Sequence, residues 1–339
     1  MRARWSLQEM VCMPKAVRFY ELGGPEVLKI EEVPLRQPQK GEVVIDVAAV
    51  GLNRAESMFF RGNYIYQPNL PAGLGYEVAG RVTAVGSGVD PSWVGKRVGT
   101  IPGFSMNHWP ALAESAVVPE NEIVELPPTL SDVDGAAAWM QYATAYGALV
   151  ELGKVGPGDF VLVTAASSSV GLAAIQIAKA QGAVAIATTR TSSKKQQLLE
   201  FGADHVIATE EEDLPARVKE ITEGKLARIV FDPVGGDYVD VLAQATSYEG
   251  TIFLYGMLSG TPTPYPMSGI WNGVALSFYL LMQTKIPGRF ERMKRYIYDR
   301  LADGSLKPRV DRVFRFEEVV DAYKYLESNQ QIGKIVITL

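Results

Sequence analysis

The chain has 339 residues, 47% of them hydrophobic and 21% charged, so it is long enough for two domains with cores of their own. Its formal net charge of −5 argues against a general nucleic-acid binder, because neutralising phosphates requires a basic face. The single cysteine, Cys12, excludes an internal disulfide framework and a structural zinc site built from several thiolates, and we expect a cytoplasmic protein.

Residues 1–12 lack the apolar core and cleavage site of a signal peptide, and we expect them to form an extension ahead of the first domain. The longest apolar runs, such as GVALSFYLLM, fall short of the roughly 20 residues that a membrane-spanning helix needs. Regular patterning begins near Met13. Short alternating runs punctuated by Gly, Pro and Asp then predict a twisted β-rich domain, with strands at 43–52, 78–86 and 96–101.

The pattern changes near residue 140. Strand-like runs at 159–165, 184–189, 228–234 and 251–256 alternate with segments of helical length, such as 192–202 and 239–250. This alternation predicts a βαβ series with a parallel sheet.

The C-terminal part of the chain has a different pattern again. An amphipathic helix at 289–306, a helical segment at 314–328 and a closing strand at 334–339 are expected to return to the first domain. The predicted domains are therefore 13–139 together with 285–339, and 140–284 as an insertion.

The turn after the first strand of the βαβ series reads AASSSVGLAAI, where a phosphate-binding turn usually has several glycines. Unpaired N–H groups and the helix dipole stabilise a pyrophosphate at such a helix start, so we assign Ser167, Ser168, Ser169 and Val170 to cofactor binding. The serines add hydroxyl donors and can cap the helix, while Gly171 would let the helix pack tightly on the strand. A well-capped helix in an ordinary βαβ unit explains these residues about equally well.

The end of the next strand indicates which dinucleotide is bound. A site that prefers NAD has an Asp or Glu about 20 residues after the turn, to bind the ribose 2′-hydroxyl. Here Arg190, Thr191, Ser192 and Lys194 occupy that stretch. A guanidinium suits a 2′-phosphate, so the sequence favours NADPH over NADH, although a solvated basic helix start is the simpler alternative.

Four further residues follow strands of the predicted parallel sheet. Asp232 and Val234 lie at the carboxyl end of the third strand, and Gly256 and Met257 at that of the fourth. Doubly wound sheets bind ligands at the carboxyl ends of their strands. We therefore assign all four to the cofactor site, as walls of a cleft rather than as reactive groups.

The motifs GLNRAESMFFRGNY, PAGLGYEVAGRVTAVGSGV, AASSSVGLAAIQIAKAQGA, EFGADHVI, FDPVGG and GKIVITL, in this order, resemble the medium-chain dehydrogenase/reductase superfamily. The resemblance is to its zinc-free quinone oxidoreductase branch and runs from about Met13 to Leu339. It implies an α/β protein in which a GroES-like β-rich catalytic domain is wrapped around a Rossmann domain with a doubly wound parallel sheet, with NADPH in the cleft between them. It also implies a homodimer in which the strand TIFLYG is an edge strand paired with its copy.

The zinc-dependent relatives in this superfamily have a Cys where this chain has Asn53 and a His where it has Tyr76. Only Glu77 remains as a possible ligand, and one carboxylate does not make a three-ligand catalytic zinc site. His108 and His205 each lack a second ligand nearby in the sequence, so we expect neither to be catalytic. The sequence therefore predicts no metal.

Without a Lewis acid, the expected reaction is hydride transfer from NADPH to a quinone or an α,β-unsaturated carbonyl compound. The resemblance places Asn53 near the nicotinamide, with its amide as a donor. Tyr64 lies where the family often has a tyrosine near the substrate, and it is expected either to donate a proton or hydrogen bond or to close the rim of the pocket. Tyr66 and water are alternative proton donors.

The resemblance also assigns two residues outside the main motifs. It places Thr144 near the nicotinamide or its phosphates, with a helix-capping hydroxyl as the alternative. Asn329 lies where the family often has a basic residue for the 2′-phosphate, and Lys334 is a second candidate for that contact.

Residues 259–285 combine prolines with Trp271, Phe278, Tyr279 and Leu280, which predict part of an apolar pocket or a dimer contact. The expected substrate is a small electrophile, and neither nucleic acid nor a membrane is an expected partner. Two other functions stay open. One is an enoyl-thioester reductase on the same scaffold, and the other is a non-catalytic NADPH-binding sensor or structural protein.

Overall fold

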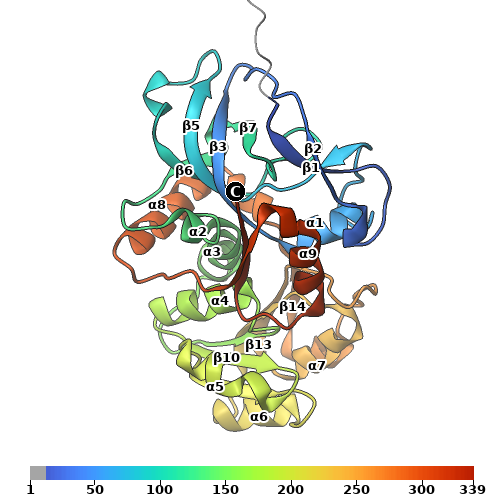
Figure 1. The fold of residues 1–339 in the computed structure, drawn as a ribbon. Coiled ribbons are helices and arrows are strands. Elements are labelled where there is room, and N and C mark those ends of the chain that lie inside the picture. Colours follow the sequence, from blue (N-terminus) through green and yellow to red (C-terminus); the bar gives the residue numbers. More distant parts are fainter. Residues whose placement is uncertain (1–12) are drawn as a thin grey trace, which may run out of the picture. The chain divides into compact units, whose positions relative to one another are not determined.

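The computed structural model describes residues 13–339, so the expected extension at 1–12, including Cys12, lies outside the described residues. Contacts divide the chain into two compact units. Unit 1 takes the chain up to Leu126 together with residues 313–329 and 336–339, and unit 2 takes residues 127–312 and 330–335. Unit 1 therefore combines the N-terminal part of the chain, blue in Figure 1, with segments from the red C-terminal part.

Unit 1 is rich in strands that pair antiparallel. Its strands are β1 (Lys15–Phe19), β2 (Lys29–Glu32), β3 (Glu42–Gly51), β4 (Ala72–Gly73), β5 (Val78–Val85), β6 (Arg97–Thr100), β7 (Ser115–Pro119) and β8 (Ile123–Glu125), and its helices are α1 (Arg54–Phe60) and α9 (Val319–Ser328). Strands β15 (Val310–Arg315) and β16 (Lys334–Thr338) begin in unit 2 and end in unit 1. The predicted strands at 43–52, 78–86 and 96–101 are confirmed as β3, β5 and β6.

The larger sheet of unit 1 is built around β3, which pairs antiparallel with β5, β7 and β16. The strand order is β15-β16-β3-β5-β6-β8, and a second sheet has the order β2-β1-β4. Strand β3 is buried over almost its whole length because it has a neighbour on each side and packs into the core. It ends at Gly51, two residues before Asn53, which is the N-cap of α1.

Unit 2 contains a parallel sheet with helices. Its strands are β9 (Phe160–Val163), β10 (Val184–Thr189), β11 (His205–Ala208), β12 (Ala227–Asp232), β13 (Thr246–Leu254) and β14 (Ala275–Phe278). Its helices are α2 (Asp132–Gly135), α3 (Trp139–Tyr146), which continues into a π-helical segment (Gly147–Leu152), α4 (Ser169–Ala180), α5 (Lys195–Glu200), α6 (Leu214–Ile221), α7 (Val239–Gln244) and α8 (Arg289–Ala302).

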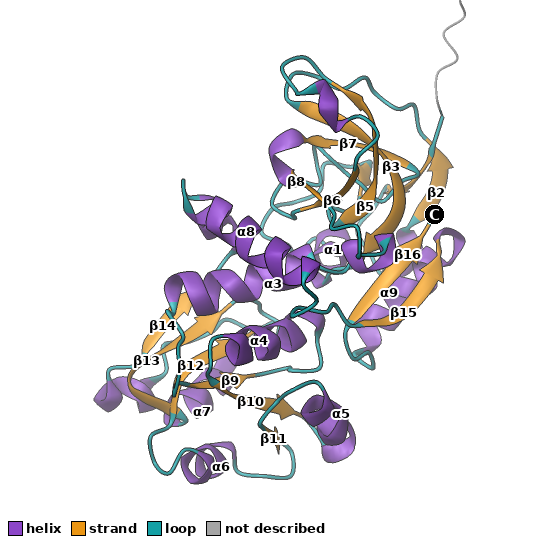
Figure 2. Cartoon of the chain, turned by 90° about the vertical axis from the view of Figure 1, so that its left-hand side faces the viewer, coloured by secondary structure: helices purple, strands orange, loops and turns teal. Residues whose placement is uncertain are grey.

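The order of the six parallel strands is β11-β10-β9-β12-β13-β14. Numbered along the chain, this is the order 3-2-1-4-5-6 of a doubly wound dinucleotide-binding sheet. The direction of winding reverses between β9 and β12, which lie side by side in Figure 2. The predicted parallel βαβ architecture is therefore confirmed.

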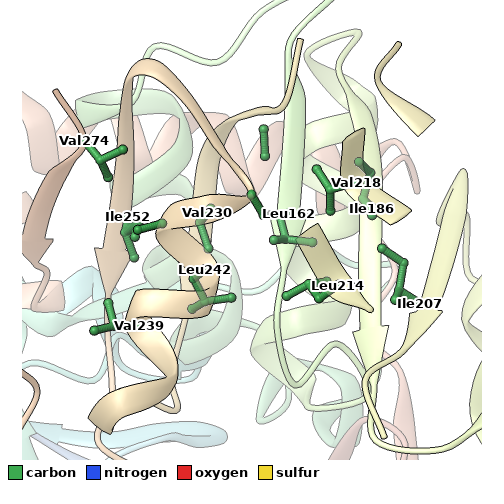
Figure 3. Close-up of a cluster of buried hydrophobic side chains, with 13 residues drawn as sticks. Leu162, Ile186, Ile207, Leu214, Val218, Val230, Val239, Leu242, Ile252 and Val274 are labelled. Atoms are coloured by element: carbon green, nitrogen blue, oxygen red, sulfur yellow. The ribbon is translucent and has the colours of Figure 1, made fainter. Parts of the chain in front are cut away.

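One face of this sheet is covered by α6 and α7 (Figure 3). Leu162, Val230 and Ile252 extend from three neighbouring strands into a cluster that α7 closes with Leu242 and α6 with Val218. Helix α4 packs on β9 and β10, with α3 beside it. Each fully buried aliphatic side chain contributes roughly 1.5–3 kcal/mol, so this cluster is a main source of stability for unit 2.

Two sequence-based expectations for unit 2 are wrong. The segment 239–250 is not helical throughout, because α7 ends at Gln244 and β13 begins at Thr246, where the β-branched side chain donates its hydroxyl to the Leu242 carbonyl at 2.7 Å. The run TIFLYG is not an edge strand either. Strand β14 pairs with it in parallel, and β14 itself ends the sheet.

The aromatic residues expected at a pocket or dimer contact separate in the structure. Tyr279 is 1% exposed, and its hydroxyl donates to the Ala143 carbonyl at 3.4 Å, so it belongs to the interior of unit 2. Gly147 makes this possible, because a Cβ there would overlap with the Tyr279 hydroxyl. Trp271 and Phe278, in contrast, are exposed.

The compact units differ from the domain boundaries predicted from sequence. Residues 127–139 and 285–312 belong to unit 2 by their contacts, although both were expected in the first domain. Helix α8 accounts for much of this difference, because it packs against α3 and buries Met293, Ile297 and Leu301. Compact units and domains are defined differently, so the predicted domain boundaries stay a prediction.

None of the described helices has the length and apolar character needed to cross a membrane.

Candidate active site

The serine-rich turn joins β9 to α4. Ser168 is the N-cap of α4, and its hydroxyl accepts a hydrogen bond from the Gly171 N–H at 3.0 Å. A Cβ at position 171 would lie 2.7 Å from backbone atoms of Ala166, so only glycine lets the helix start this close to the strand. The expectation that a serine of this turn caps the helix is confirmed for Ser168, and so is the packing role of Gly171.

The first turn of α4 fits a pyrophosphate. Ser167, Ser168, Ser169 and Val170 are all partly exposed, and α4 is 12 residues long, so its dipole and its unpaired N–H groups favour an anion at this end. The Ser167 carbonyl is not free for a ligand, since it accepts from the Gly333 N–H at 3.0 Å.

Asp232 lies at the carboxyl end of β12, where the winding of the sheet reverses. It is fully buried, and its carboxylate accepts from the Thr164 hydroxyl and from the Gly235 N–H, the latter at 2.7 Å. Burial raises its pKa, while these donors oppose that shift. Asp232 thus ties the ends of β9 and β12 together at the position where doubly wound sheets bind ligands.

The loops after β12 and β13 also meet at this edge. The Ser259 N–H donates to the Val234 carbonyl at 2.9 Å, and a Cβ at Gly256 would lie 2.7 Å from the Pro233 carbonyl oxygen. Met257 follows with 41% of its surface exposed. The structure therefore brings Val234, Gly256 and Met257 together beside Asp232.

Arg190 and Lys194 follow β10 at the same edge. Arg190 is exposed, whereas Lys194 is half-buried with its Nζ 3.1 Å from the Gln331 carbonyl and 3.4 Å from the Ser167 hydroxyl. Burial lowers the pKa of Lys194; Asp311 opposes this shift, and Arg190 adds to it. Two cations are thus neighbours beside the serine turn, and Gln331 and Asp311 are members of this group that sequence reasoning missed.

Three further predicted residues are buried or have partners within the chain. Thr144 sits in the middle of α3 and donates its hydroxyl to the Met140 carbonyl at 2.6 Å, so the capping alternative is wrong. Asn329 ends α9 in unit 1 and accepts from the Arg54 guanidinium at 2.6 Å. Lys334 is only 1% exposed, and it follows Gly333, whose N–H donates to the Ser167 carbonyl of the serine turn.

In unit 1, Asn53 connects the end of β3 to α1. Its side-chain nitrogen donates to the Gly51 carbonyl at 3.1 Å and to the Glu77 carboxylate at 3.0 Å, and its backbone N–H donates to Glu56 at 2.9 Å. The amide nitrogen has two hydrogens, and both are used inside the unit. Asn53 is therefore not the outward-facing donor that the sequence suggested.

Tyr64 lies in an aromatic cluster that follows α1. Its ring centroid is 4.9 Å from that of Tyr66 and 6.3 Å from that of Phe59, in edge-to-face arrangements. The Tyr66 hydroxyl accepts from the Met106 N–H at 3.1 Å. Burial, with a further contribution from Tyr66, raises the pKa of Tyr64 to about 12, so its phenol keeps its proton near neutral pH and can donate a hydrogen bond.

The side chains of the described part of the chain do not fit a catalytic zinc ion. Residues 13–339 contain no group of three or more His, Cys, Asp or Glu side chains placed to bind one. His108 lies in a turn and His205 at the start of β11, away from each other in the chain. Glu77 is fully buried and already accepts from Asn53.

Family models match both parts of the chain. Residues 39–128 match the alcohol dehydrogenase GroES-like domain, and residues 169–294 match the zinc-binding dehydrogenase model. Among curated proteins, quinone oxidoreductase of Salmonella typhimurium is 34% identical over 77% of this chain and 77% of its own length. Quinone oxidoreductase 1 of Escherichia coli is 32% identical over 96% of this chain and 99% of its own. The rat synaptic vesicle membrane protein VAT-1 homolog is 31% identical, with coverages of 93% and 81%.

Solved structures agree with these relatives. Escherichia coli quinone oxidoreductase complexed with NADPH has a TM-score of 0.87 at 31% identity and covers 96% of this chain and 100% of its own. A mycobacterial protein complexed with NADPH has a TM-score of 0.87 at 28% identity, with the same coverages. A GroES-like unit together with a doubly wound parallel sheet defines an oxidoreductase of the medium-chain dehydrogenase/reductase type. Within that superfamily, the chain belongs to the quinone oxidoreductase branch.

Proposed function

We propose that this chain, an NADPH-dependent oxidoreductase, transfers hydride to quinones or α,β-unsaturated carbonyl compounds without the help of a metal. The relatives named quinone oxidoreductase support the acceptor class, and those solved with NADPH support the cofactor. The observation from this chain that carries the proposal is the pair of cations, Arg190 and Lys194, beside the serine turn.

The proposed cofactor contacts lie on unit 2. The first turn of α4, from Ser168 onward, binds the pyrophosphate through backbone N–H groups. Arg190 and Lys194 bind the 2′-phosphate, and the Lys194 ammonium is already positioned by the Gln331 carbonyl. The residues directly after β10, from Arg190 to Lys194, include no acid that would favour NADH, and the partly exposed Met257 provides an apolar wall.

Bound NADPH supplies the hydride, and one proton completes the reduction. A quinone takes both and becomes a hydroquinone. An enone takes the hydride at its β-carbon, holds the electron pair as an enolate oxygen, and takes the proton at its α-carbon. We propose that the neutral phenol of Tyr64 donates a hydrogen bond to that oxygen. Tyr64 is also the proposed source of the proton, and water is the alternative source.

Metal-free chemistry is part of this proposal. In the zinc-dependent members of the superfamily, metal ligands stand at the positions of Asn53 and Tyr76. Here the Asn53 amide serves as a donor to Glu77. Among residues 13–339 no thiolate or imidazole joins this carboxylate in a group that could hold a metal, and a single carboxylate that already accepts a hydrogen bond from an amide does not make a three-ligand zinc site.

The test is NADPH oxidation by the purified protein, with quinones, 2-alkenals and enoyl thioesters as acceptors, in the presence of EDTA and with NADH in parallel. We expect turnover with NADPH that chelation does not reduce. In Arg190→Gln, the KM for NADPH is expected to rise roughly tenfold or more while that for NADH stays unchanged, because a charge-assisted hydrogen bond contributes about 1.5–3 kcal/mol. Thr191→Ala is the matched control.

Each contrary result has a defined meaning. Loss of activity on chelation contradicts the metal-free reaction. Turnover confined to enoyl thioesters favours the enoyl reductase, and NADPH binding without turnover of any acceptor favours a non-catalytic NADPH-binding protein.

We also propose that the protein forms a homodimer through the edge of the unit 2 sheet, since β14 has a neighbour on one side only among the described strands.

A further inference from the structure

The loops after β10 and β11 lie next to each other, because these two strands pair in parallel (Figure 2). The loop after β10 contains Arg190 and Lys194, the proposed contacts of the 2′-phosphate. The loop after β11 contains three consecutive glutamates at positions 210–212. Acidic side chains therefore follow one strand directly beside the cations that follow its neighbour.

Two of these glutamates are used in other ways. The Glu212 carboxylate accepts from the Lys195 ammonium and from the Ala208 N–H, so its charge is already paired. Glu210 contacts the loop after β10 through its backbone, whose N–H donates to the Arg190 carbonyl at 2.9 Å. The exposed side chain of Glu210 takes no part in that hydrogen bond. These contacts therefore do not fix a free carboxylate against the loop.

Glu211 differs, because its carboxylate is held against the loop after β10. One carboxylate oxygen accepts from the Ser192 N–H at 2.8 Å. Ser192 lies two residues from Arg190 and two from Lys194, and two residues of chain span at most about 7 Å between Cα atoms. The donor is a neutral N–H, so this contact leaves the negative charge of Glu211 beside the two cations.

A carboxylate in this position acts differently on the two dinucleotides. The 2′-phosphate of NADPH carries up to about two negative charges, and a carboxylate within one screening length, roughly 8–10 Å at ordinary ionic strength, repels it. The 2′-hydroxyl of NADH is neutral and is not repelled. Arg190 and Lys194 attract the phosphate, and Glu211 reduces the net attraction.

We propose that Glu211 is a specificity-determining residue, whose carboxylate opposes the 2′-phosphate and thereby limits the preference of the site for NADPH over NADH. The inference rests on the function proposed above, because it needs Arg190 and Lys194 to bind that phosphate. Sequence patterns do not indicate Glu211, since 19 residues separate it from Ser192 and the contact arises only where β10 and β11 pair.

The test compares Glu211→Gln with Glu210→Gln in the full chain. Glutamine keeps an oxygen that can accept from the Ser192 N–H and removes only the charge, and Glu210→Gln removes the same charge from the adjacent exposed residue. We expect Glu211→Gln to lower the dissociation constant for NADPH about three- to fivefold and to leave that for NADH unchanged, as for the loss of one exposed charge. Glu210→Gln should change either constant less than about twofold. Fluorescence of the bound reduced nicotinamide measures both constants.

Salt provides a second readout, which a purely structural role of Glu211 would not move. At about 0.5 M salt the screening length falls to roughly 4 Å, so the difference in NADPH affinity between wild type and Glu211→Gln should largely disappear. A difference that persists at high salt would show that the substitution alters the shape of the site, and it would overturn the proposal.

Three other results also overturn the role of Glu211. Weaker NADPH binding in Glu211→Gln would show that the carboxylate supports the site. An equal gain in Glu210→Gln would show a general effect of net charge. A parallel shift in the dissociation constant for NADH would show an effect on the whole dinucleotide rather than on its 2′-phosphate.

Arg190→Gln, measured alongside, separates failure of this inference from failure of the proposed function. If Arg190→Gln weakens NADPH binding and Glu211→Gln has no effect, only the role of Glu211 is overturned. If neither variant changes NADPH binding, the 2′-phosphate does not lie at this loop, and the proposed cofactor contacts fail together with the inference.

Discussion

Glu42, at the start of β3, has more hydrogen-bond donors than any carboxylate described above. The Arg36 guanidinium binds it through two nitrogens at 2.5 and 2.8 Å, the Trp109 indole donates at 2.8 Å and the Gln39 N–H at 2.7 Å. These donors, Arg36 foremost, lower its pKa from the usual 4.5 to about 2 against the effect of burial. In its ionised form, Glu42 thus joins the segment just before β3 to the loop that contains Trp109.

We predict that Glu42→Gln destabilises the protein by about 1–3 kcal/mol at pH 7, toward the lower end because Arg36 is partly exposed to solvent. The folded-state pKa is depressed, so the carboxylate's contribution is complete above pH 4.5 and is lost as the pH falls toward 2. Urea unfolding at pH 7 and pH 3 measures this. The difference between wild type and variant should shrink at pH 3, and a constant difference would contradict the role of charge.

Single residues also mark the limit of sequence-based prediction. The sequence predicts that Ser168 can cap a helix and that Gly171 allows close packing, because both effects are local. It does not predict that the Asn53 amide is used by Glu77, 24 residues away, since that pairing depends on how β3 and β5 align. The same holds for Lys194, whose carbonyl partner at Gln331 is 137 residues distant.

At the scale of elements, the contact of α4 with β9 positions the proposed phosphate site. We predict that Gly171→Ala destabilises unit 2 by about 1–3 kcal/mol, because the new methyl group meets the Ala166 backbone and α4 must shift outward. NADPH affinity should fall with it. Both effects can be measured on one sample, by thermal unfolding and by quenching of protein fluorescence with NADPH.

Gly156→Ala provides the control for this prediction. Gly156 also lies in a loop of unit 2 just before β9, but a Cβ there meets no atom within 4 Å. Its stability and NADPH affinity should match those of the wild type. If both variants behave alike, close helix packing is not what Gly171 provides.

The elements that the sequence predicts well are those with a strong apolar period. Strand β10 is found at the expected residues, and β9 and β12 within a few positions. The polar run Thr246–Gly250 has no strand-like apolar alternation, so the sequence does not predict the start of β13. The pairing of Thr246 with Ala227 defines this start, and a bulge separates it from the rest of the ladder. Strand β14 has only four residues and was hidden in a longer apolar run.

At the scale of the whole molecule, exposed apolar side chains gather in the chain segment that leads into the edge strand β14. Met267, Ile270 and Trp271 lie in one short 3-10 helix (Met267–Asn272) and are 63%, 50% and 90% exposed, and Phe278 on β14 is 41% exposed. Surfaces of this kind, next to an unpaired strand edge, are typical of protein interfaces. The homodimer nevertheless stays a prediction.

We predict that Trp271→Ser weakens self-association, shifting the dimer dissociation constant upward by roughly tenfold or more, because exposed tryptophans are frequent interface hot spots. Sedimentation velocity over a range of concentrations measures the shift. Val94→Ser serves as the comparison, since Val94 is 50% exposed but belongs to unit 1. A wild-type protein that sediments as a monomer at all concentrations would contradict the prediction.

The path of the last ten residues limits how this protein can be recombined with its relatives. Gln330–Ile335 belongs to unit 2, where the Lys334 N–H donates to the Arg309 carbonyl at 2.8 Å, while the residues on both sides of it belong to unit 1. A hybrid gene joined once, between Leu126 and Pro127, would keep unit 2 from a single parent. Its unit 1 would be mixed, with β16 from one parent pairing with β3 from the other. Exchange of unit 2 alone therefore requires four junctions, and natural shuffling of this unit by one crossover is disfavoured.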